Sequence, residues 1–346
     1  DNGRLYQKYS GKKLNHDSDI QYLPQGTEAY LTHGMEDYFE PAIHIRHNDN
    51  NSSLLLKYVD HSSNAIGNGV NETVITLKDD KYPVTVKLHY VAYGKENIIR
   101  TFTEISHEEK KPVILCKYAS SMLHLNSSKY FLTEFSGDWA HEANVTEREL
   151  AFGKKVIDTK LGARANMFVS PFFQLALDNP SQENAGEVLV GTIGWTGNFR
   201  FTFEVDNKNE LRIISGINPY DSEYSLPARE VFRTPDFYFT YSTQGKGEAS
   251  RNFHDWARNH QVKNGNDTRM TLLNNWESTY FDFDENKLIG LMDEATKLGV
   301  DMFLLDDGWF ANKYPRSSDH QGLGDWEETA DKLPNGVGRL VEEAQK

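Results

Sequence analysis

The sequence contains very little cysteine, with only Cys116 among 346 residues. A single thiol forms no intrachain disulfide and no thiolate cluster for zinc or an iron–sulfur centre. The chain also lacks the HExxH and EF-hand spacings of metal sites. No stretch approaches the roughly 20 consecutive apolar residues of a membrane-spanning helix. We therefore expect no metal, no cofactor and no insertion into a membrane.

Several sequence signatures of other protein classes are missing as well. The chain has no GxxxxGK[ST] loop and no GxGxxG motif, so nothing supports a nucleotide cofactor. It has no GxSxG elbow, which disfavours a serine hydrolase. Basic residues are outnumbered, and the net charge of −14 repels nucleic acid and anionic membrane surfaces. We expect no nucleic-acid partner.

Residues 18–245 consist of many short segments that are rich in β-branched and aromatic residues. Clusters of glycine, asparagine and aspartate, such as residues 66–69 and 78–81, separate these segments and are typical of turns. The pattern predicts strands at residues 54–58, 74–77, 84–90, 98–102, 188–195 and 199–204. So many short strands, with hardly any helical periodicity, predict a large antiparallel β-sandwich.

The pattern changes after residue 245. Apolar residues at helical spacing predict a helix near residues 246–260, and residues 262–268 resemble a linker. A strand at 270–276, a helix at about 284–299, a strand at 302–305 and a final helix around Leu340 are then expected. This order predicts a parallel sheet, either doubly wound or closed into a barrel. Two such units are a quarter of an eight-stranded barrel, so if the sheet closes into a barrel, the sequence contains only its start.

The strongest chemical signal is the pair Asp306 and Asp307, which directly follows the second apolar strand and precedes Gly308 and Trp309. Two acids at such a place are costly to bury unless polar or cationic groups meet them. Sugar hydroxyls fit, because a carboxylate accepts two hydroxyl protons while a tryptophan covers the apolar face of the ring. The alternative is that both acids bond to the local backbone as turn or helix-cap residues.

Two further clusters contain aromatic and acidic residues. Trp276 and Glu277 lie at the end of the first apolar strand, where a tryptophan serves either as a sugar platform or as ordinary packing. Asp325 and Trp326 lie in the long loop of about residues 311–335, and loops of that length are often functional. The alternative for this third cluster is an exposed turn.

Taken together, these segments resemble a known family. Residues 274–283, 303–310 and 323–326 closely resemble the start of the catalytic barrel of family thirty-six α-galactosidases. Upstream, residues 37–42, 137–139, 170–173, 197–199, 216–218 and 233–236 resemble the N-terminal β-supersandwich of that family. The resemblance covers nearly the whole chain.

The resemblance implies a β-supersandwich domain at residues 1–245, a helix and linker at 246–269, and the incomplete start of a TIM (β/α)8 barrel at 270–346. It implies a retaining hydrolase that removes terminal α-linked galactose from oligosaccharides of the raffinose and melibiose type, and that is a homo-oligomer at full length. Family members use two catalytic aspartates. By the order of the family's motifs, both are expected downstream of Lys346, so the fragment alone is expected to be inactive.

What the resemblance assigns to this chain is recognition of the sugar. Asp306 and Asp307 match the pair that binds the galactose 4- and 6-hydroxyls, and Trp276 matches the wall near the leaving group. Asp307→Asn is accordingly expected to lower turnover by orders of magnitude and to leave thermal stability close to that of the wild type. Further candidates for substrate contacts are Trp309, Asp325, Trp326 and Asp37.

The match at Asp37 is weaker, because the family motif commonly reads Gly-Asp-Phe-Arg and this chain has Glu36-Asp37-Tyr38-Phe39.

Two other functions remain open at this point. One is a galactosyl transferase of the raffinose-synthase type, and the other is a non-catalytic module for carbohydrate binding or assembly. The compartment also stays open between the cytoplasm and the periplasm or exterior.

Overall fold

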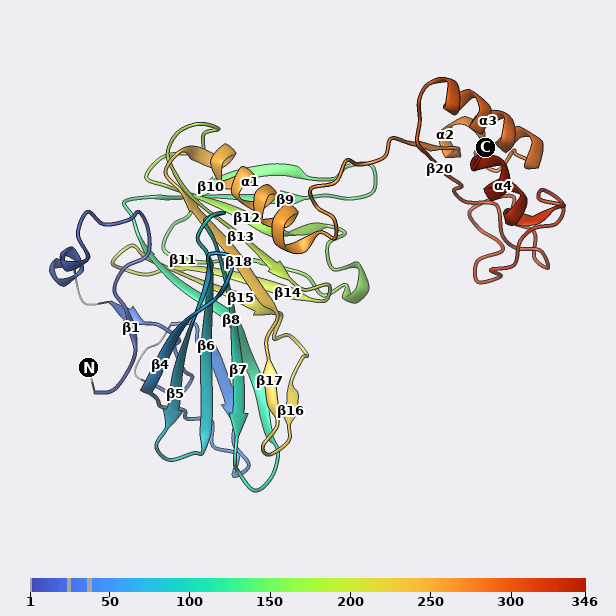
Figure 1. Cartoon of the computed structure of the whole chain (residues 1–346). Helices are drawn as coiled ribbons and strands as arrows, with labels where there is room; N and C mark the ends of the chain where they lie inside the picture. Colours follow the sequence, from blue (N-terminus) through green and yellow to red (C-terminus); the bar gives the residue numbers. More distant parts are fainter. Residues whose placement is uncertain (1, 24–25, 36–38) are drawn as a thin grey trace. The chain divides into compact units, whose positions relative to one another are not determined.

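The computed structural model describes residues 2–23, 26–35 and 39–346. The chain divides into two compact units, Asp1–Gly265 and Asn266–Lys346, which we call the N-terminal unit and the C-terminal unit. Figure 1 shows both units and labels most of their helices and strands.

The larger sheet of the N-terminal unit has ten antiparallel strands in the order β10-β9-β12-β13-β18-β7-β6-β5-β4, with β17 paired to β7. These strands are β4 (Leu56–Gly67), β5 (Val70–Asp79), β6 (Val84–Tyr93), β7 (Ile98–His107), β9 (Tyr130–Ser136), β10 (Asn144–Glu149), β12 (Val169–Leu177), β13 (Glu187–Gly194), β17 (Val231–Arg233) and β18 (Asp236–Ser242).

The smaller sheet has six antiparallel strands in the order β11-β14-β15-β8-β16, with β3 paired to β8. These strands are β3 (Ile43–Arg46), β8 (Val113–Asn126), β11 (Gly153–Asp158), β14 (Phe199–Val205), β15 (Glu210–Ile217) and β16 (Tyr224–Leu226). Outside the two sheets lie the strand pair β1 (Tyr6–Gln7) and β2 (Thr27–Glu28) and the short 3-10 helices η1 (Asp17–Tyr22) and η2 (Gly162–Arg164).

The inward-facing side chains of the two sheets pack together in two large buried clusters, of which the first contains Phe173. Phe173 on β12 is fully buried, and its ring centre lies 5.2 Å from that of Phe201 and 4.9 Å from that of Phe203, both on β14 of the other sheet. Side chains of β8 and β15 complete the same cluster. Two antiparallel sheets that bury their facing side chains form a β-sandwich. The predicted large antiparallel sandwich is therefore confirmed.

The turn between β4 and β5 illustrates how the sequence sets the strand boundaries. Asn68 and Gly69 both have left-handed backbone angles, with φ of 52° and 75°. Asparagine and glycine tolerate this region best, and such a turn matches the twist of a hairpin. Pairing then extends along ten residues of β5, so the strand is longer than the predicted segment 74–77.

Helix α1 (Gly245–Trp256) covers the outer face of the larger sheet (Figure 1). Ala249 packs against Val188 and Val190 of β13, and Trp256 packs near Tyr93 of β6. The helix continues into a π-helical turn, η3 (Ala257–Gln261), so the helix predicted near residues 246–260 is confirmed. Among the described residues, none of the helices combines the length and the apolar character that crossing a membrane requires.

The C-terminal unit follows the predicted order of strand, helix, strand and helix. Its strands β19 (Leu272–Asn274) and β20 (Met302–Leu304) pair in parallel. Its helices are α2 (Trp276–Thr279), α3 (Glu285–Lys297) and α4 (Gly336–Ala344). The buried core of the unit consists of Phe283, Leu288, Met292, Leu333 and Leu340.

Local side-chain chemistry sets the limits of these elements. The Asp284 side chain accepts a hydrogen bond from the Lys287 amide at the start of α3, and Gly299 follows the helix with a φ of 75°. Both features are typical helix caps. The first strand ends earlier than predicted, because the Asn274 side-chain oxygen accepts the Trp276 amide at 2.8 Å and a helical turn begins there.

Candidate functional site

Polar side chains collect where the two parallel strands of the C-terminal unit end. Asn274 is the last residue of β19 and pairs with Leu304, the last residue of β20. Asp306 and Asp307 follow β20 after one further residue. Because parallel strands end at the same edge of a sheet, these side chains lie together, as the sequence predicted.

Asp306 is held by both strand ends. One carboxylate oxygen accepts the Asn274 side-chain amide at 2.6 Å, and the other accepts the Asp307 backbone amide at 2.7 Å. The Asp306 backbone amide donates to the Asn275 side-chain oxygen at 2.8 Å. Asn275 is fully buried and also donates to the Thr279 hydroxyl, so its own position is fixed. The Asp306 carboxylate therefore has a defined place at the strand edge.

Asp307 is held by an arginine that the sequence did not single out. Nε and Nη2 of Arg316 donate to the two carboxylate oxygens of Asp307, and the Gly308 amide donates to one of them at 2.7 Å. The Arg316 side chain is only 5% exposed, and that of Asp307 is 23% exposed. The hydrogen bonds from Arg316 lower the pKa of Asp307 below its ordinary value, although burial opposes the shift. Asp307 is thus an ionised acceptor at neutral pH.

A second cation lies near the same carboxylate. Nζ of Lys332 donates to the Phe281 backbone oxygen at 2.8 Å, and burial lowers the pKa of this lysine while the charge of Asp307 raises it. Gly308 sits between these groups with a φ of 92°, and a Cβ there would lie 3.1 Å from Phe281 and 3.3 Å from Nζ of Lys332. Glycine is favoured at this turn because the positive φ is strained for other residues, and a Cβ would also crowd the neighbouring side chains.

The three tryptophans near the site have different environments. Trp276 is half-buried and meets Phe281 edge to face, with ring centres 4.9 Å apart. Trp309 packs against the hydrophobic core of the unit. Trp326 is 65% exposed, and its ring lies 4.6 Å from that of Phe310.

The remaining candidates behave differently. One carboxylate oxygen of Asp325 accepts the backbone amides of Lys313 and Tyr314, both at 3.0 Å. The Asp325 side chain thereby joins two parts of the same loop, which fits the alternative that this cluster is an exposed turn. Asp37 lies outside the described residues. No group of three or more His, Cys, Asp or Glu side chains in the described part of the chain is arranged to hold a metal ion.

The two interpretations of Asp306 and Asp307 each describe part of the geometry. Each acid accepts one neighbouring backbone amide, and each also bonds to a distant side chain. The ion pair with Arg316 revises the expectation that Asp307→Asn leaves stability unchanged. An asparagine would remove the two-pronged ion pair of a buried guanidinium and leave it only the exposed Asp319 carboxylate at 3.9 Å, which is destabilising.

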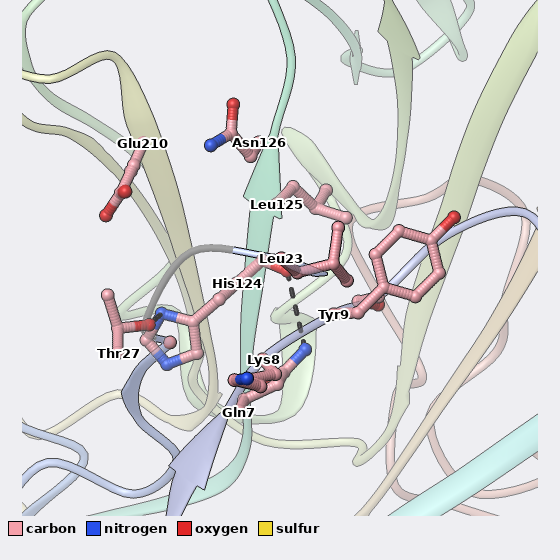
Figure 2. A pocket seen from close by; sticks show the side chains of 11 residues that line it. Gln7, Lys8, Tyr9, Leu23, Thr27, His124, Leu125, Asn126 and Glu210 are labelled. Atoms are coloured by element: carbon pink, nitrogen blue, oxygen red, sulfur yellow. Dashed lines mark hydrogen bonds between the residues drawn. The ribbon is translucent and has the colours of Figure 1, made fainter. Parts of the chain in front are cut away.

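A separate cavity of about 270 Å³ lies in the N-terminal unit (Figure 2). Tyr9, Leu125 and His124 line it, and the His124 ring is hydrogen-bonded to the Thr27 hydroxyl. Glu210 is the single acid among its described lining residues. The cavity lacks a pair of carboxylates, so we take the strand-end acids as the candidate functional site.

His124 gives a testable pH dependence of stability. Burial first, and then the positive charge of Arg212, lower the pKa of His124 from 6.5 to about 4. The unfolded chain therefore binds this proton more readily than the folded chain does. Above pH 6.5 the ring is neutral in both states and costs no stability. As the pH falls from 6.5 to about 4, the free energy of unfolding decreases, by about 1–3 kcal/mol in total.

We expect His124→Gln to reduce this loss in urea unfolding measured at pH 7, 5.5 and 4.5. The matched control is His141→Gln, at an exposed position of the same unit. A pH dependence that is equal in wild type and His124→Gln would contradict the prediction.

Models of two protein families match the chain. The Glycosyl hydrolase family 36 N-terminal domain matches residues 3–227, and Melibiase matches residues 231–346. Among curated proteins, the chain is 30% identical over 358 residues to α-galactosidase Mel36A of Lactobacillus acidophilus, covering 98% of this chain and 48% of the relative. It is 32% identical over 298 residues to α-galactosidase AgaA of Geobacillus stearothermophilus, covering 85% and 39%.

Solved structures of α-galactosidases also match the chain. A variant of AgaA from G. stearothermophilus in complex with raffinose matches with a TM-score of 0.91 and 27% identity, over 99% of this chain and 52% of that chain. Another AgaA variant, in complex with stachyose, matches with a TM-score of 0.85 and 28% identity, over 99% and 49%. The chain thus spans about half the length of the relatives that it matches.

Proposed function

Because the chain belongs to glycosyl hydrolase family 36, we propose that the protein is an α-galactosidase that hydrolyses terminal α-galactosides of raffinose-type oligosaccharides. Relatives at 30–32% identity are α-galactosidases, and AgaA variants have been crystallised with raffinose and stachyose. In this proposal the chain supplies recognition of the galactose ring.

The observation that carries the proposal is the pair of carboxylates at the end of β20. Asp306 and Asp307 are both positioned as hydrogen-bond acceptors. Asn274, which donates to Asp306, also accepts the backbone amide of the half-buried Trp276. We propose that they receive the 4- and 6-hydroxyls of galactose and that Trp276 walls the sugar. The axial 4-hydroxyl distinguishes galactose from glucose, so a carboxylate placed to accept it discriminates between the two sugars.

The lowered pKa of Asp307 favours recognition over acid catalysis. A general acid must hold a proton near the working pH, and a carboxyl stabilised in its ionised form by Arg316 does not. This argument concerns the general acid alone, because a nucleophilic carboxylate is itself ionised. From the order of the family's motifs, we propose that the nucleophile and the acid/base aspartates lie outside residues 1–346. Trp309, Asp325, Trp326 and Asp37 stay as further candidates for substrate contacts.

The proposal extends to the architecture and the assembly. We propose a β-supersandwich at residues 1–245, a connecting helix and linker at 246–269, and the first part of a (β/α)8 barrel at 270–346. The parallel pair β19 and β20, with α3 between them in the chain, supports the barrel. We also propose that the full-length protein is a homo-oligomer.

The function is tested with chromogenic glycosides and the full-length protein. We expect release of nitrophenol from p-nitrophenyl α-galactoside. The matched control substrate is p-nitrophenyl α-glucoside, which differs only at the 4-hydroxyl. We expect a kcat/KM at least about a hundredfold lower for the glucoside, because the carboxylate that receives the axial hydroxyl is then left without its partner.

Three outcomes would overturn the proposal. Equal hydrolysis of both glycosides would remove the role of the acids in selecting galactose. Galactose binding in calorimetry without any hydrolysis would indicate a binding module. Product that forms only when a sugar acceptor such as sucrose is added would indicate a transferase.

A further inference from the structure

Arg316 makes contacts that go beyond a simple ion pair. Two of its nitrogens hold both oxygens of the Asp307 carboxylate. Its third nitrogen, Nη1, donates to the backbone oxygens of Ser318 at 3.1 Å and Gln321 at 2.6 Å. One guanidinium therefore fixes the carboxylate after β20 and the turn of the loop that follows.

Aromatic rings complete the surroundings of this guanidinium. Its central carbon lies 5.5 Å from the ring centre of Phe281 and 5.3 Å from that of Phe310. These distances are in the range of cation–π contacts. Planar stacking and a two-pronged bond to a carboxylate are properties of arginine that a lysine does not reproduce.

The bonds of Arg316 also determine which acceptor positions on the two acids stay open. An ionised carboxylate offers about four acceptor positions, two on each oxygen. On Asp307, the Gly308 amide and Nε of Arg316 fill both positions of one oxygen, and Nη2 fills one position of the other. Among the described residues, Asp306 receives one bond on each oxygen. Asp307 thus has one open position and Asp306 has two.

We propose that Arg316 is a positioning residue for sugar recognition, which fixes the Asp307 carboxylate so that a single acceptor position faces one hydroxyl of the substrate. The inference rests on the proposed function, since it assumes that Asp307 receives a sugar hydroxyl. Arg316 touches no substrate itself and acts only through Asp307. Asp306, with two open positions, is able to accept two hydroxyl donors.

The test compares Arg316→Gln and Arg316→Lys with Arg339→Gln in the full-length protein. Arg339 is a half-buried arginine of the same unit, paired with Glu342 and Glu343 on α4. We expect Arg316→Gln to lower kcat/KM for p-nitrophenyl α-galactoside by about a hundredfold, because a small misplacement of a binding group has effects of that order. Arg316→Lys should recover only a small part, and Arg339→Gln should match the wild type.

Two readouts separate positioning from a purely structural role. The acidic limb of the kcat/KM profile should move to higher pH in Arg316→Gln, because the hydrogen bonds that keep Asp307 ionised are lost. Arg316→Gln should also change kcat/KM by less than about threefold when Asp307→Asn is already present, because its effect passes through Asp307.

Full kcat/KM and an unmoved acidic limb in folded Arg316→Gln would overturn the inference and leave the proposed function intact. The inference would also be overturned if the losses of kcat/KM caused by Arg316→Gln and by Asp307→Asn were independent and combined fully in the double variant. Where Arg316→Gln does not fold, Arg316→Lys carries the same comparison of pH profiles. A wild-type protein that hydrolyses no α-galactoside would instead overturn the proposed function.

Discussion

Asp307→Asn is expected to lower kcat/KM for an α-galactoside by about a hundredfold or more and to destabilise the protein by about 1–2 kcal/mol. Activity falls because an amide presents fewer acceptor positions to the hydroxyl and places an N–H group against Nη2 of Arg316. Stability falls because the buried guanidinium loses its nearer counter-charge and keeps only the exposed Asp319 at 3.9 Å. Steady-state kinetics and thermal unfolding of the same preparations measure the two effects.

Asp306→Asn is the matched control for the stability effect. Asp306 accepts its bonds from the Asn274 side chain and the Asp307 amide, both of which are neutral donors. Its replacement removes no ion pair, so we expect a comparable loss of activity and a smaller loss of stability. Equal stability losses in both variants would contradict the role that we give to Arg316. Wild-type activity in Asp307→Asn would remove Asp307 from the sugar site.

Much of the fold could be predicted, because the signals that carry it are local. Alternating and β-branched segments gave the strands of the sandwich, and Asn68 with Gly69 marked a hairpin turn. Apolar residues at helical spacing and the cap at Gly299 gave α3 almost to the residue. Strand length was harder to predict. The length of β5 depends on how far its neighbours β4 and β6 supply hydrogen-bond partners, and these partners lie outside the segment itself.

Strand pairing across the sandwich could not be predicted from these signals. In the larger sheet β13 pairs with β18, and β18 pairs with β7, which lies far away along the chain. Such contacts depend on how the whole core packs, and no local residue pattern encodes them. The sequence therefore predicted a sandwich without its strand order.

The candidate site was predictable in part for a similar reason. Two acids after a buried strand require a polar or cationic partner, and this requirement could be stated from the sequence. Lys313, Arg316 and Lys332 are all cations of the loop that follows. Only the structure shows that Arg316 binds Asp307 and that Asn274 binds Asp306. Which of these cations meets Asp307 depends on how the loop folds back onto the strand end, and the sequence alone does not show this.

The largest expected effect on stability is that of Phe173→Ala in the sandwich core, a loss of about 3–5 kcal/mol. Phe173 is fully buried and packs edge to face on Phe201 and Phe203 of the opposite sheet. Its strand pairs on both sides, with β9 and β13, so hydrogen bonds hold the backbone and the cavity cannot collapse. Urea unfolding followed by tryptophan fluorescence measures the loss.

Phe152→Ala is the control for this prediction, because Phe152 is 76% exposed in the same unit and its removal should change stability by less than about 0.5 kcal/mol.

A second variant tests the shape of the cavity that Phe173→Ala leaves. A Cβ on Gly191 would lie 2.6 Å from Phe173 and 2.7 Å from Phe237, so Gly191→Ala alone should be destabilising. Combined with Phe173→Ala, the added methyl group has room, and the two losses should sum to more than the loss in the double variant. Additive losses, or a Phe173→Ala variant as stable as Phe152→Ala, would contradict a core packed around this ring.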